Sequence, residues 1–394
     1  MKFTYAKRMD NIKASEIREL LKLTQKPEII SFAGGLPAPE SFPVKELVEI
    51  GRKVLEETGT QALQYGSTEG FPPLREAISQ RMAKVMVDVT ADDILVTSGS
   101  QQGLDFAAKI FINPGDVIIC ESPTYLGAIN AFRAYEPEFV EVGIDNEGMI
   151  MEDLENALKE NANAKFIYVI PDFQNPSGKT WSIERRKKLI ELANKYDVVI
   201  LEDNPYGELR FEGEILPAVK HYDTEDRVIF LGTFSKILCP GLRLGWVAAG
   251  PEILNKFIMI KQGADLQSST ISQMEVAKFL EEYSIDDHIA GIIELYRGRR
   301  DLMMKTIKEE FPKEATYTYP EGGLFTWVVL PEYMNARELA VEALKQNVAY
   351  VPGGSFYPNG GNENTFRLNY SNMDDERIVE GITRLGKVLK DAIR

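Results

Sequence analysis

Seven short apolar runs between residues 94 and 249 constrain the fold more than any other feature of this chain. Most of them are continuous rather than alternating, which is typical of strands that are covered on both faces of a sheet. Helical patterns lie between several runs, and the pattern over residues 183–196 gathers its apolar side chains on one face. This alternation predicts an α/β fold with a mostly parallel, seven-stranded sheet flanked by helices. The runs are residues 94–97 (ILVT), 117–120 (VIIC), 139–142 (FVEV), 166–170 (FIYVI), 198–201 (VVIL), 228–232 (VIFLG) and 246–249 (WVAA).

The last hundred residues follow a different pattern. A long polar helix is predicted over residues 285–310, short strands near 325–330 and 349–351, and a closing helix over 375–393. These elements predict a smaller α+β domain. A chain of 394 residues also favours two domains.

The domain boundaries follow from these patterns. We expect a large domain over residues 40–285 and a small domain made of residues 1–39 and 286–394. Within the N-terminal segment, residues 15–23 (SEIRELLKL) predict a short amphipathic helix with Ser15 as a plausible cap.

The composition excludes several classes of protein. With 60 acidic and 45 basic residues, the net charge is −15, which repels a nucleic-acid backbone. Two Cys and two His are too few for a disulfide scaffold or a dense metal cluster, so we expect no metal. No apolar run approaches the roughly 18 residues of a membrane helix, and the start of the chain lacks an apolar signal core. We therefore expect a cytoplasmic protein that binds neither membrane nor nucleic acid.

A strand-to-helix junction at residues 98–103 (SGSQQG) is a candidate anion site. It follows the run at 94–97 and precedes a helical pattern over 104–111. Small residues at such a junction expose backbone N–H groups at the positive end of a helix, which suits a phosphate. An ordinary tight turn explains the residues equally well. The spacing Gly99-x-x-x-Gly103 does not match the dinucleotide fingerprint.

A lysine follows the run at residues 228–232. Lys236 stands in the sequence Thr233-Phe-Ser235-Lys236, and Arg243 comes seven residues later. A partly desolvated amine has a lowered pKa and can form a Schiff base. The hydroxyls and the guanidinium can hold a phosphate dianion. A lone lysine is usually solvated, but the neighbours of Lys236 are mostly apolar.

Other polar residues also follow apolar runs. Asp203 comes soon after the run at 198–201, and an acid at the carboxyl end of a strand often lies at the rim of an α/β active site. A carboxylate there could keep a heterocyclic nitrogen protonated, although a helix cap is the alternative role. Asn175 and Tyr125 likewise follow runs, and Arg367 lies within a short apolar segment where a guanidinium requires an anion, such as a substrate carboxylate.

Taken in order along the chain, these motifs resemble those of the fold-type-I, pyridoxal-phosphate-dependent aminotransferases of class I/II. The motifs are Asn175-Pro-Ser-Gly, Asp203-x-x-Tyr206, Ser235-Lys236 with Arg243, and Arg367. The resemblance covers essentially the whole chain. It implies that pyridoxal 5′-phosphate is the cofactor, that Lys236 forms the Schiff base and shuttles the substrate Cα proton, and that Asp203 keeps the pyridine nitrogen protonated.

The resemblance also implies roles for other residues. Tyr125 would stack on the ring as the third catalytic residue, and Asn175 and Tyr206 would bind the ring's 3′ oxygen. Arg367 would bind the substrate α-carboxylate, with Asn175 beside it. Tyr65 would reach across a subunit interface and contact the phosphate bound by the partner, which implies a homodimer with shared active sites. The phosphate would be held by Ser100, Gln101, Thr233, Ser235 and Arg243, with Thr233 the weakest candidate.

Within the superfamily, the chain resembles the 2-aminoadipate and kynurenine aminotransferase group most. The supporting stretches are residues 14–22 (ASEIRELLK) and 31–37 (SFAGGLP). In that group the N-terminal helix covers the active site, so Arg18 would meet an acidic substrate side chain and Gly35 would lie against the substrate carboxylate. The resemblance implies an enzyme of amino acid metabolism. It would move an amino group between a 2-oxo acid, for which we expect 2-oxoglutarate, and 2-aminoadipate, an aromatic, a branched-chain or a broad range of L-amino acids.

Two alternatives use the same fold. A β-eliminating lyase would need the same lysine, aspartate and arginines. A non-catalytic regulator that binds pyridoxal phosphate is a second alternative, which the intact Lys236 argues against. Regulators that borrow this fold carry an N-terminal DNA-binding domain, and only about thirty residues precede the predicted core here.

Overall fold

The computed structural model describes residues 3–12 and 26–393. The helix predicted over residues 15–23, with Ser15 and Arg18, lies outside the described residues. Within the described residues, no helix is both long enough and apolar enough to cross a membrane.

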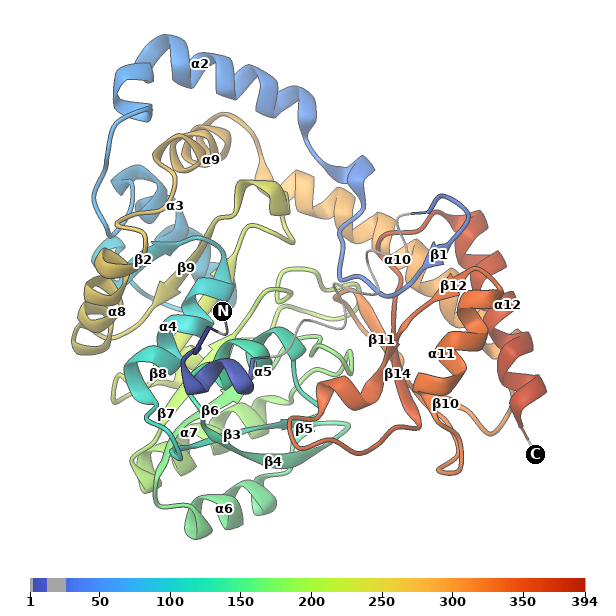
Figure 1. Cartoon of the computed structure of the whole chain (residues 1–394). Helices are drawn as coiled ribbons and strands as arrows, with labels where there is room; N and C mark the ends of the chain where they lie inside the picture. Colours follow the sequence, from blue (N-terminus) through green and yellow to red (C-terminus); the bar gives the residue numbers. More distant parts are fainter. Residues whose placement is uncertain (1–2, 13–25, 394) are drawn as a thin grey trace.

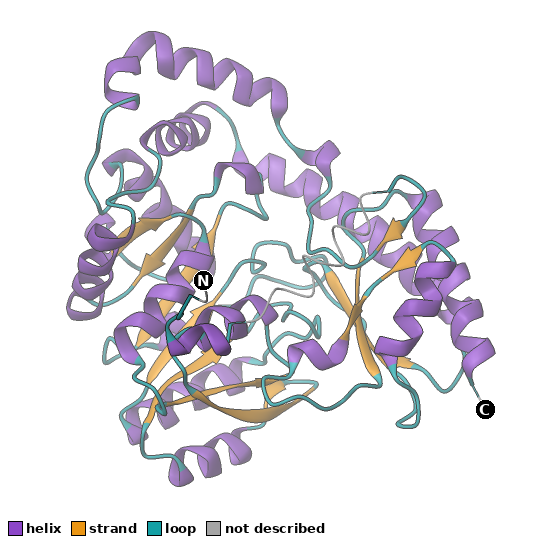
Figure 2. Ribbon diagram, viewed as in Figure 1, coloured by secondary structure: helices purple, strands orange, loops and turns teal. Residues whose placement is uncertain are grey.

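A large central sheet contains all seven predicted strands (Figures 1 and 2). Its strand order is β2-β9-β8-β7-β6-β3-β4-β5, and β8, β7, β6, β3 and β4 run parallel. β9 is antiparallel to both of its neighbours. The eighth strand, β5, pairs antiparallel with β4 and has two residues, too few to form an apolar run. The bounds are β2 Ile94–Thr97, β3 Val117–Ser122, β4 Glu138–Asp145, β5 Gly148–Met149, β6 Ala164–Val169, β7 Val199–Asp203, β8 Val228–Thr233 and β9 Gly245–Ala248.

Helices cover both faces of this sheet, which explains the continuous apolar runs. Ile118 and Cys120 of β3 belong to the core shared with α4 and α5 on one face. Val117 and Ile119 belong to the core shared with α6 and α7 on the other face. Because alternate residues of a strand point to opposite faces, both sets must be apolar. The bounds are α4 Ser100–Phe111, α5 Leu126–Arg133, α6 Met151–Glu160, α7 Ile183–Tyr196 and α8 Pro251–Ala264.

A second, antiparallel sheet lies beside the first and is built from the C-terminal part of the chain (Figure 1). Its order is β10-β11-β14-β13, with β10 Thr316–Tyr317, β11 Phe325–Val329, β13 Val351–Pro352 and β14 Thr365–Asn369. A separate pair joins β1 Ile30–Ser31 from the N-terminal segment to β12 Val348–Ala349 in parallel. The strand predicted near residues 349–351 is therefore two strands, which pair with different partners on either side of the buried Tyr350.

The C-terminal helices follow the predicted pattern closely. α10 spans Ile285–Glu310, as predicted, and α12 spans Asp375–Ala392, one residue short of the predicted end. α10 and α12 pack against each other, and α11 spans Ala336–Lys345. The second sheet and these helices form the α+β arrangement expected of this region, while the exact domain boundaries stay a prediction.

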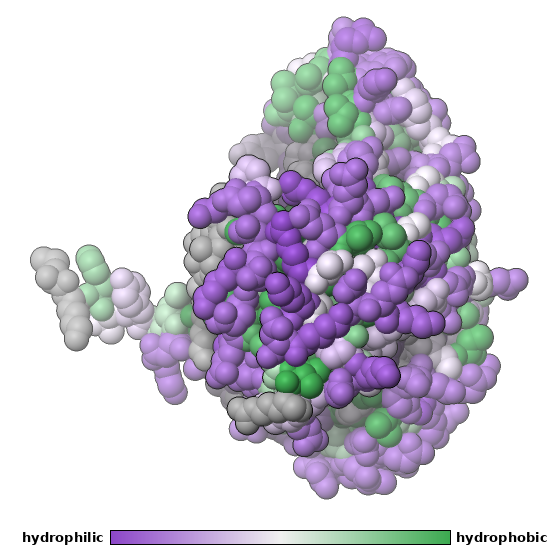
Figure 3. Space-filling model, turned by 90° about the vertical axis from the view of Figure 1, so that its right-hand side faces the viewer, coloured by the Kyte–Doolittle hydropathy of each residue, from purple (hydrophilic) through white to green (hydrophobic). Residues whose placement is uncertain are grey.

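Three further helices, α2 Val44–Ala62, α3 Pro72–Met82 and α9 Thr270–Glu282, lie at the end of the molecule that carries β2 and β9 (Figure 1). α2 packs against α9 and leaves Val44 and Val48 exposed. In Figure 3, hydrophilic side chains cover most of the visible face, and hydrophobic atoms gather at the top, at the height of α2.

Candidate active site

Lys236 lies just beyond the carboxyl end of β8, where the loops after the parallel strands meet. Its Nζ donates a hydrogen bond of 2.8 Å to the carbonyl oxygen of Gly35. Burial, with the positive charges of Arg367 and Arg243, lowers the pKa of the amine to about 8. The amine can therefore lose its proton close to neutral pH. Gly35 can approach because it lacks a side chain: a Cβ there would lie 3.0 Å from the Phe325 ring.

Asp203, the last residue of β7, is buried. Its Oδ2 accepts a hydrogen bond of 2.9 Å from the hydroxyl of Tyr168. Its Oδ1 is buried and has no hydrogen-bond partner among the described residues. Burial raises the pKa of the carboxyl to about 7, while the hydrogen bond from Tyr168 acts in the opposite direction. A buried oxygen without a partner is costly, so Oδ1 is suited to accept a hydrogen bond from a bound ligand.

Arg367 lies on β14 with 1% of its surface exposed. Its guanidinium packs against the rings of Phe325 and Phe356, with the central carbon 4.1 and 5.0 Å from the two ring centres. Nη1 donates to Oδ1 of Asn175 and Nη2 to the carbonyl oxygen of Ala33, both at 2.7 Å. Burial lowers the pKa of the guanidinium to about 10, which leaves it protonated at neutral pH.

The charge of this arginine is not balanced by a neighbouring acid. No carboxylate forms a salt bridge with Arg367 anywhere in the described chain, and its buried Nε also lacks a partner there. A buried, uncompensated cation is stabilised by an anionic ligand, and the planar guanidinium matches a carboxylate.

Asn175 and Tyr206 link the arginine to the loops after β6 and β7. The amide of Asn175 donates to the Tyr206 hydroxyl over 3.5 Å, while its oxygen accepts from Arg367. Tyr206 is buried, and its ring meets that of Phe325 edge to face at 6.0 Å between centres. The predicted residues 175, 206 and 367 are thus in contact, although the chain separates them widely.

The start of α4 forms the candidate anion site. The helix begins at Ser100, directly after Gly99, whose φ is +77°. A Cβ on Gly99 would lie 2.5 Å from the guanidinium of Arg243, so glycine permits this arginine to approach the helix N-terminus. Nη1 of Arg243 donates to the hydroxyl of Ser235 at 3.4 Å. A helix N-terminus, a guanidinium and hydroxyls together suit a phosphate dianion.

Tyr125 and Gln101 lie next to this anion site. The Gln101 amide donates to the carbonyl oxygen of Gly127 at 2.8 Å, and the Tyr125 hydroxyl donates to the Gln101 side-chain oxygen over 3.5 Å. The ring of Tyr125 lies against Gly127, where a Cβ would overlap it. The ring is thereby held at the start of α5, beside the start of α4.

Among the described residues, two predicted ones lie at or beyond the edge of this cluster. The Thr233 hydroxyl donates to the Leu244 carbonyl at 3.2 Å and accepts from the Ser235 N–H at 3.1 Å, so it is occupied by the loop backbone. Tyr65, just after α2, is 78% exposed. Arg18 lies outside the described residues.

Four groups at this site were not predicted from the sequence: the Tyr168 hydroxyl, the rings of Phe325 and Phe356, and the Ala33 carbonyl. The sequence signal for Tyr168 was present, because a phenol within the apolar run FIYVI must find a hydrogen-bond partner when buried. The two phenylalanines are typical of ordinary core residues. A backbone carbonyl leaves no signature in the sequence.

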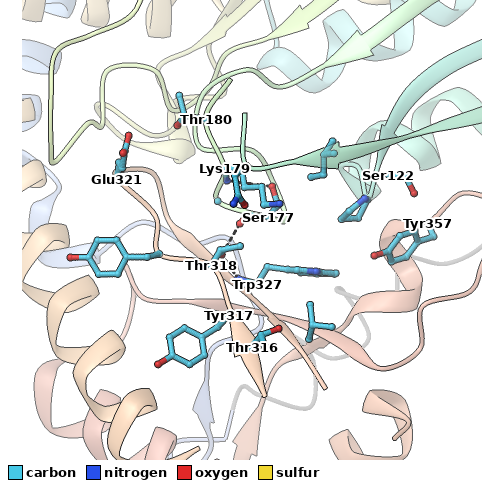
Figure 4. Close-up of a pocket in the computed structure, with 16 residues that line it drawn as sticks. Ser122, Ser177, Lys179, Thr180, Thr316, Tyr317, Thr318, Glu321, Trp327 and Tyr357 are labelled. Atoms are coloured by element: carbon cyan, nitrogen blue, oxygen red, sulfur yellow. Dashed lines mark hydrogen bonds between the residues drawn. The ribbon is translucent and has the colours of Figure 1, made fainter. Parts of the chain in front are cut away.

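A separate cleft of about 570 Å³ is lined by Ser177 and Lys179, which follow Asn175 in the same loop, and by residues of the second sheet such as Trp327 (Figure 4). None of the predicted site residues lines it. Its wall includes Ser177, whose carbonyl oxygen accepts a hydrogen bond of 2.7 Å from the Thr318 hydroxyl. That hydroxyl in turn accepts from the backbone N–H of Trp327 at 3.0 Å. The second sheet, through the connection between β10 and β11, therefore contacts the Asn175 loop and fixes its position.

Comparison with known families decides between the classes of protein considered so far. The family model described as aminotransferase class I and II matches residues 28–385. The chain belongs to this family. It is a pyridoxal-phosphate-dependent aminotransferase, and the neighbouring structures that hold forms of this cofactor agree with that assignment.

Several relatives of this aminotransferase cover nearly its whole length. The aromatic-amino-acid aminotransferase 1 of Thermococcus litoralis is 49% identical over 97% of this chain and 93% of its own. The kynurenine aminotransferase of Pyrococcus horikoshii, solved with PMP, is 43% identical with a TM-score of 0.95, covering 99% and 98% of the two chains. LysN, the alpha-aminoadipate aminotransferase of Thermus thermophilus, was solved with N-(5′-phosphopyridoxyl)-L-leucine. It is 42% identical with a TM-score of 0.92, covering 98% and 97%.

Proposed function

We propose that this aminotransferase accepts a broad range of L-amino acids, including aromatic amino acids, 2-aminoadipate and leucine, and transfers the amino group to 2-oxoglutarate. The relatives described above support this range, since their names span aromatic amino acids, kynurenine and alpha-aminoadipate, and one was solved with a leucine conjugate. The resemblance to the 2-aminoadipate and kynurenine group supports the same range.

The observation that carries the proposal is the unbalanced Arg367 close to Lys236. A buried cation without an acidic partner in the described chain suits the α-carboxylate that every amino acid and 2-oxo acid shares. Binding that group would place the substrate Cα near the amine of Lys236. Gly35 accepts from that amine and packs against Phe325, so it would form part of the same pocket.

The described residues fit the cofactor. The orphaned Oδ1 of Asp203 would accept from the protonated ring nitrogen. Asn175 and Tyr206 would bind the 3′ oxygen, and Tyr125 would stack on the ring. The phosphate would lie at the start of α4, held by Ser100, Gln101, Ser235 and Arg243, with Thr233 shaping the loop.

Bound pyridoxal phosphate supplies an aldehyde that exchanges amino groups and a protonated ring that stabilises negative charge at the substrate Cα. The chain supplies the proton transfers. Lys236 Nζ takes the proton from Cα and returns it, which its lowered pKa permits near neutral pH. Arg367 holds the carboxylate so that the Cα–H bond faces this amine, and Asp203 keeps the ring nitrogen charged.

A spectrophotometric screen tests the proposal. Each amino acid is added alone to the holoenzyme, and a true donor converts the absorbance of the bound cofactor to that of pyridoxamine phosphate. Adding 2-oxoglutarate should then restore the original spectrum. Conversion by a single amino acid would contradict the broad range, and recovery only with another 2-oxo acid would replace 2-oxoglutarate as acceptor.

We also propose that the enzyme is a homodimer in which Tyr65 reaches the phosphate site of the partner. The 78% exposure of this tyrosine supports the idea, as do the exposed Val44, Val48 and Leu63 on and beside α2. Exposed apolar side chains along one helix would be covered by a partner at such an interface. Light scattering should give the mass of a dimer, and Tyr65→Phe should weaken cofactor binding because it removes the hydroxyl. A monomer with full cofactor affinity would contradict both statements.

The location in the cell is also a proposal. Cys120 and Cys239 are both free and buried, which suits the reducing cytoplasm. Cell fractionation with the tagged full chain would test it, and recovery of the enzyme outside the cytoplasmic fraction would contradict it.

A further inference from the structure

Tyr168 lies beside Asp203 because of the register between β6 and β7. Tyr168 pairs with Leu201, and Asp203 follows Leu201 by two residues, so the three side chains share one face of the sheet. The Tyr168 hydroxyl donates to Oδ2 of Asp203 at 2.9 Å. No other hydrogen bond to the Asp203 carboxylate occurs within the described ranges 3–12 and 26–393.

We infer that Tyr168 is a positioning residue for catalysis: its hydroxyl fixes the Asp203 carboxylate so that Oδ1 faces the cofactor's ring nitrogen, and it keeps that carboxylate ionised. The inference rests on the proposed role of Asp203. It adds to the site a residue of β6, the strand that pairs with the β7 strand of Asp203.

The surroundings of Tyr168 make its hydroxyl a dedicated donor. The side chain is fully buried, and its ring meets Phe132 edge to face at 5.4 Å, which restricts its movement. Burial, with the charge of Asp203, raises the pKa of the phenol far above its ordinary value. The phenol therefore stays protonated at neutral pH, and its proton is directed at Asp203.

The carboxylate needs this donor because it is buried. Desolvation favours the neutral form of the carboxyl. A neutral carboxyl has no charge with which to stabilise the protonated ring nitrogen, so that nitrogen would lose its proton. The ionisable groups around the pair are Tyr125, Tyr206 and Glu121, and burial raises the pKa of Glu121 to about 8. None of these groups is a cation, so among the described residues the hydrogen bond from Tyr168 is the interaction that favours ionised Asp203.

Two variants distinguish a positioning role of Tyr168 in catalysis from a contribution of its hydrogen bond to folding stability alone. Tyr168→Phe keeps the ring and removes only the hydroxyl. Tyr350→Phe is the matched control, because Tyr350 is also fully buried and donates a single hydrogen bond, of 2.6 Å, to the carbonyl oxygen of Ala336. Both variants lose one buried phenol hydrogen bond, so similar losses of thermal stability are expected.

The decisive measurement is the ¹⁵N NMR signal of the holoenzyme loaded with ring-¹⁵N pyridoxal phosphate. In Tyr168→Phe the carboxylate becomes more basic and takes a larger share of the proton, so the signal should move toward that of unprotonated pyridine. In Tyr350→Phe the signal should stay at the wild-type position. Turnover should fall about ten- to a hundredfold in Tyr168→Phe, as for a lost hydrogen bond to a charged group, with KM nearly unchanged.

Asp203→Asn makes the outcomes distinguishable. If the signal moves in Asp203→Asn but not in Tyr168→Phe, the role of Tyr168 is overturned and the proposed function stands. If neither variant moves the signal, the assignment of Asp203 itself fails. If Tyr168→Phe does not fold, Tyr168 is replaced by 3-fluorotyrosine. This residue keeps the ring and the hydroxyl, and its hydroxyl is more acidic and therefore a stronger donor to Asp203. Its signal should stay at the protonated end, and a shift toward unprotonated pyridine would overturn the inference.

Discussion

The side-chain nitrogen of Lys236 lies 2.8 Å from the carbonyl oxygen of Gly35, a residue 201 positions earlier in the chain. The amine is thus held by the segment that follows β1, at a point where only glycine can pass the Phe325 ring without displacing it. Its orientation therefore depends on two segments that lie far apart in the sequence.

We predict that Lys236→Ala abolishes covalent attachment of the cofactor. Turnover should fall by more than the ~10²–10⁴-fold expected for loss of a proton relay, because the amine also binds the cofactor. Borohydride reduction followed by mass spectrometry measures the attachment. Lys179→Ala is the control, since Lys179 is also half-buried but lines the separate cleft. Cofactor fixed to the Lys236→Ala chain would contradict the assignment.

The pH dependence of cofactor capture should reveal the lowered pKa of Lys236. Only the neutral amine attacks an aldehyde, so capture by the apoenzyme should speed up as pH rises and level off above about 8. An ordinary lysine would continue to gain rate up to about 10.4. Stopped-flow absorbance with added pyridoxal phosphate measures the profile. A rate still rising above about pH 9 would show that burial and the two arginines do not lower the pKa.

Asp203→Asn should keep the fold and bind the cofactor but lose most of its ability to deprotonate substrate. The amide cannot hold a proton on the ring nitrogen by charge. Exchange of the substrate α-hydrogen with deuterated water measures this step without the later ones. Near-normal exchange would move the role to another acid.

Arg367→Ala should weaken every amino acid and every 2-oxo acid alike. The expected loss is roughly 2–5 kcal/mol, as for a buried, charge-paired contact. Arg367→Lys is an informative control, because it keeps the charge but loses the fork that contacts both Asn175 and Ala33. KM values for aromatic, acidic and aliphatic donors measure the effect, and a loss confined to one class would rule out a carboxylate clamp.

Arg18→Ala tests the expectation from the N-terminal motif. If this arginine meets the distal carboxylate of acidic substrates, the variant should lose on the order of 1–3 kcal/mol with 2-aminoadipate and 2-oxoglutarate. Leucine and phenylalanine should react as before. Equal kinetics in the wild type and the variant for both classes would make Arg18 a surface residue.

The sequence predicted the parts of the fold that depend on continuous apolar runs. Strands covered on both faces must be apolar at every position, so β6 and β8 are visible in the sequence. β5 was missed because its two residues form no pattern. The helices α2, α3 and α9 were not predicted.

At the site, the side chains that follow strands were predictable, because parallel strands bring their carboxyl ends to one edge. Lys236, Asp203 and Asn175 were found in this way. Tyr168 was missed because a tyrosine within an apolar run looks like packing, and its function depends on the register between two strands. The contact of Arg367 with Ala33 could not be predicted, since it requires the path of the N-terminal segment in three dimensions.

The guanidinium of Arg367 already joins three distant pieces of chain: β14, the loop of Asn175 and the N-terminal segment at Ala33. A carboxylate bound there would act as a brace between them. Substrates and their unreactive analogues should therefore raise the melting temperature and slow proteolysis between the two sheets, increasingly as their concentration rises above the Kd. An aminotransferase built in this way is mechanically stiffest while the carboxylate of a substrate or product is bound, and loosest once the site is empty.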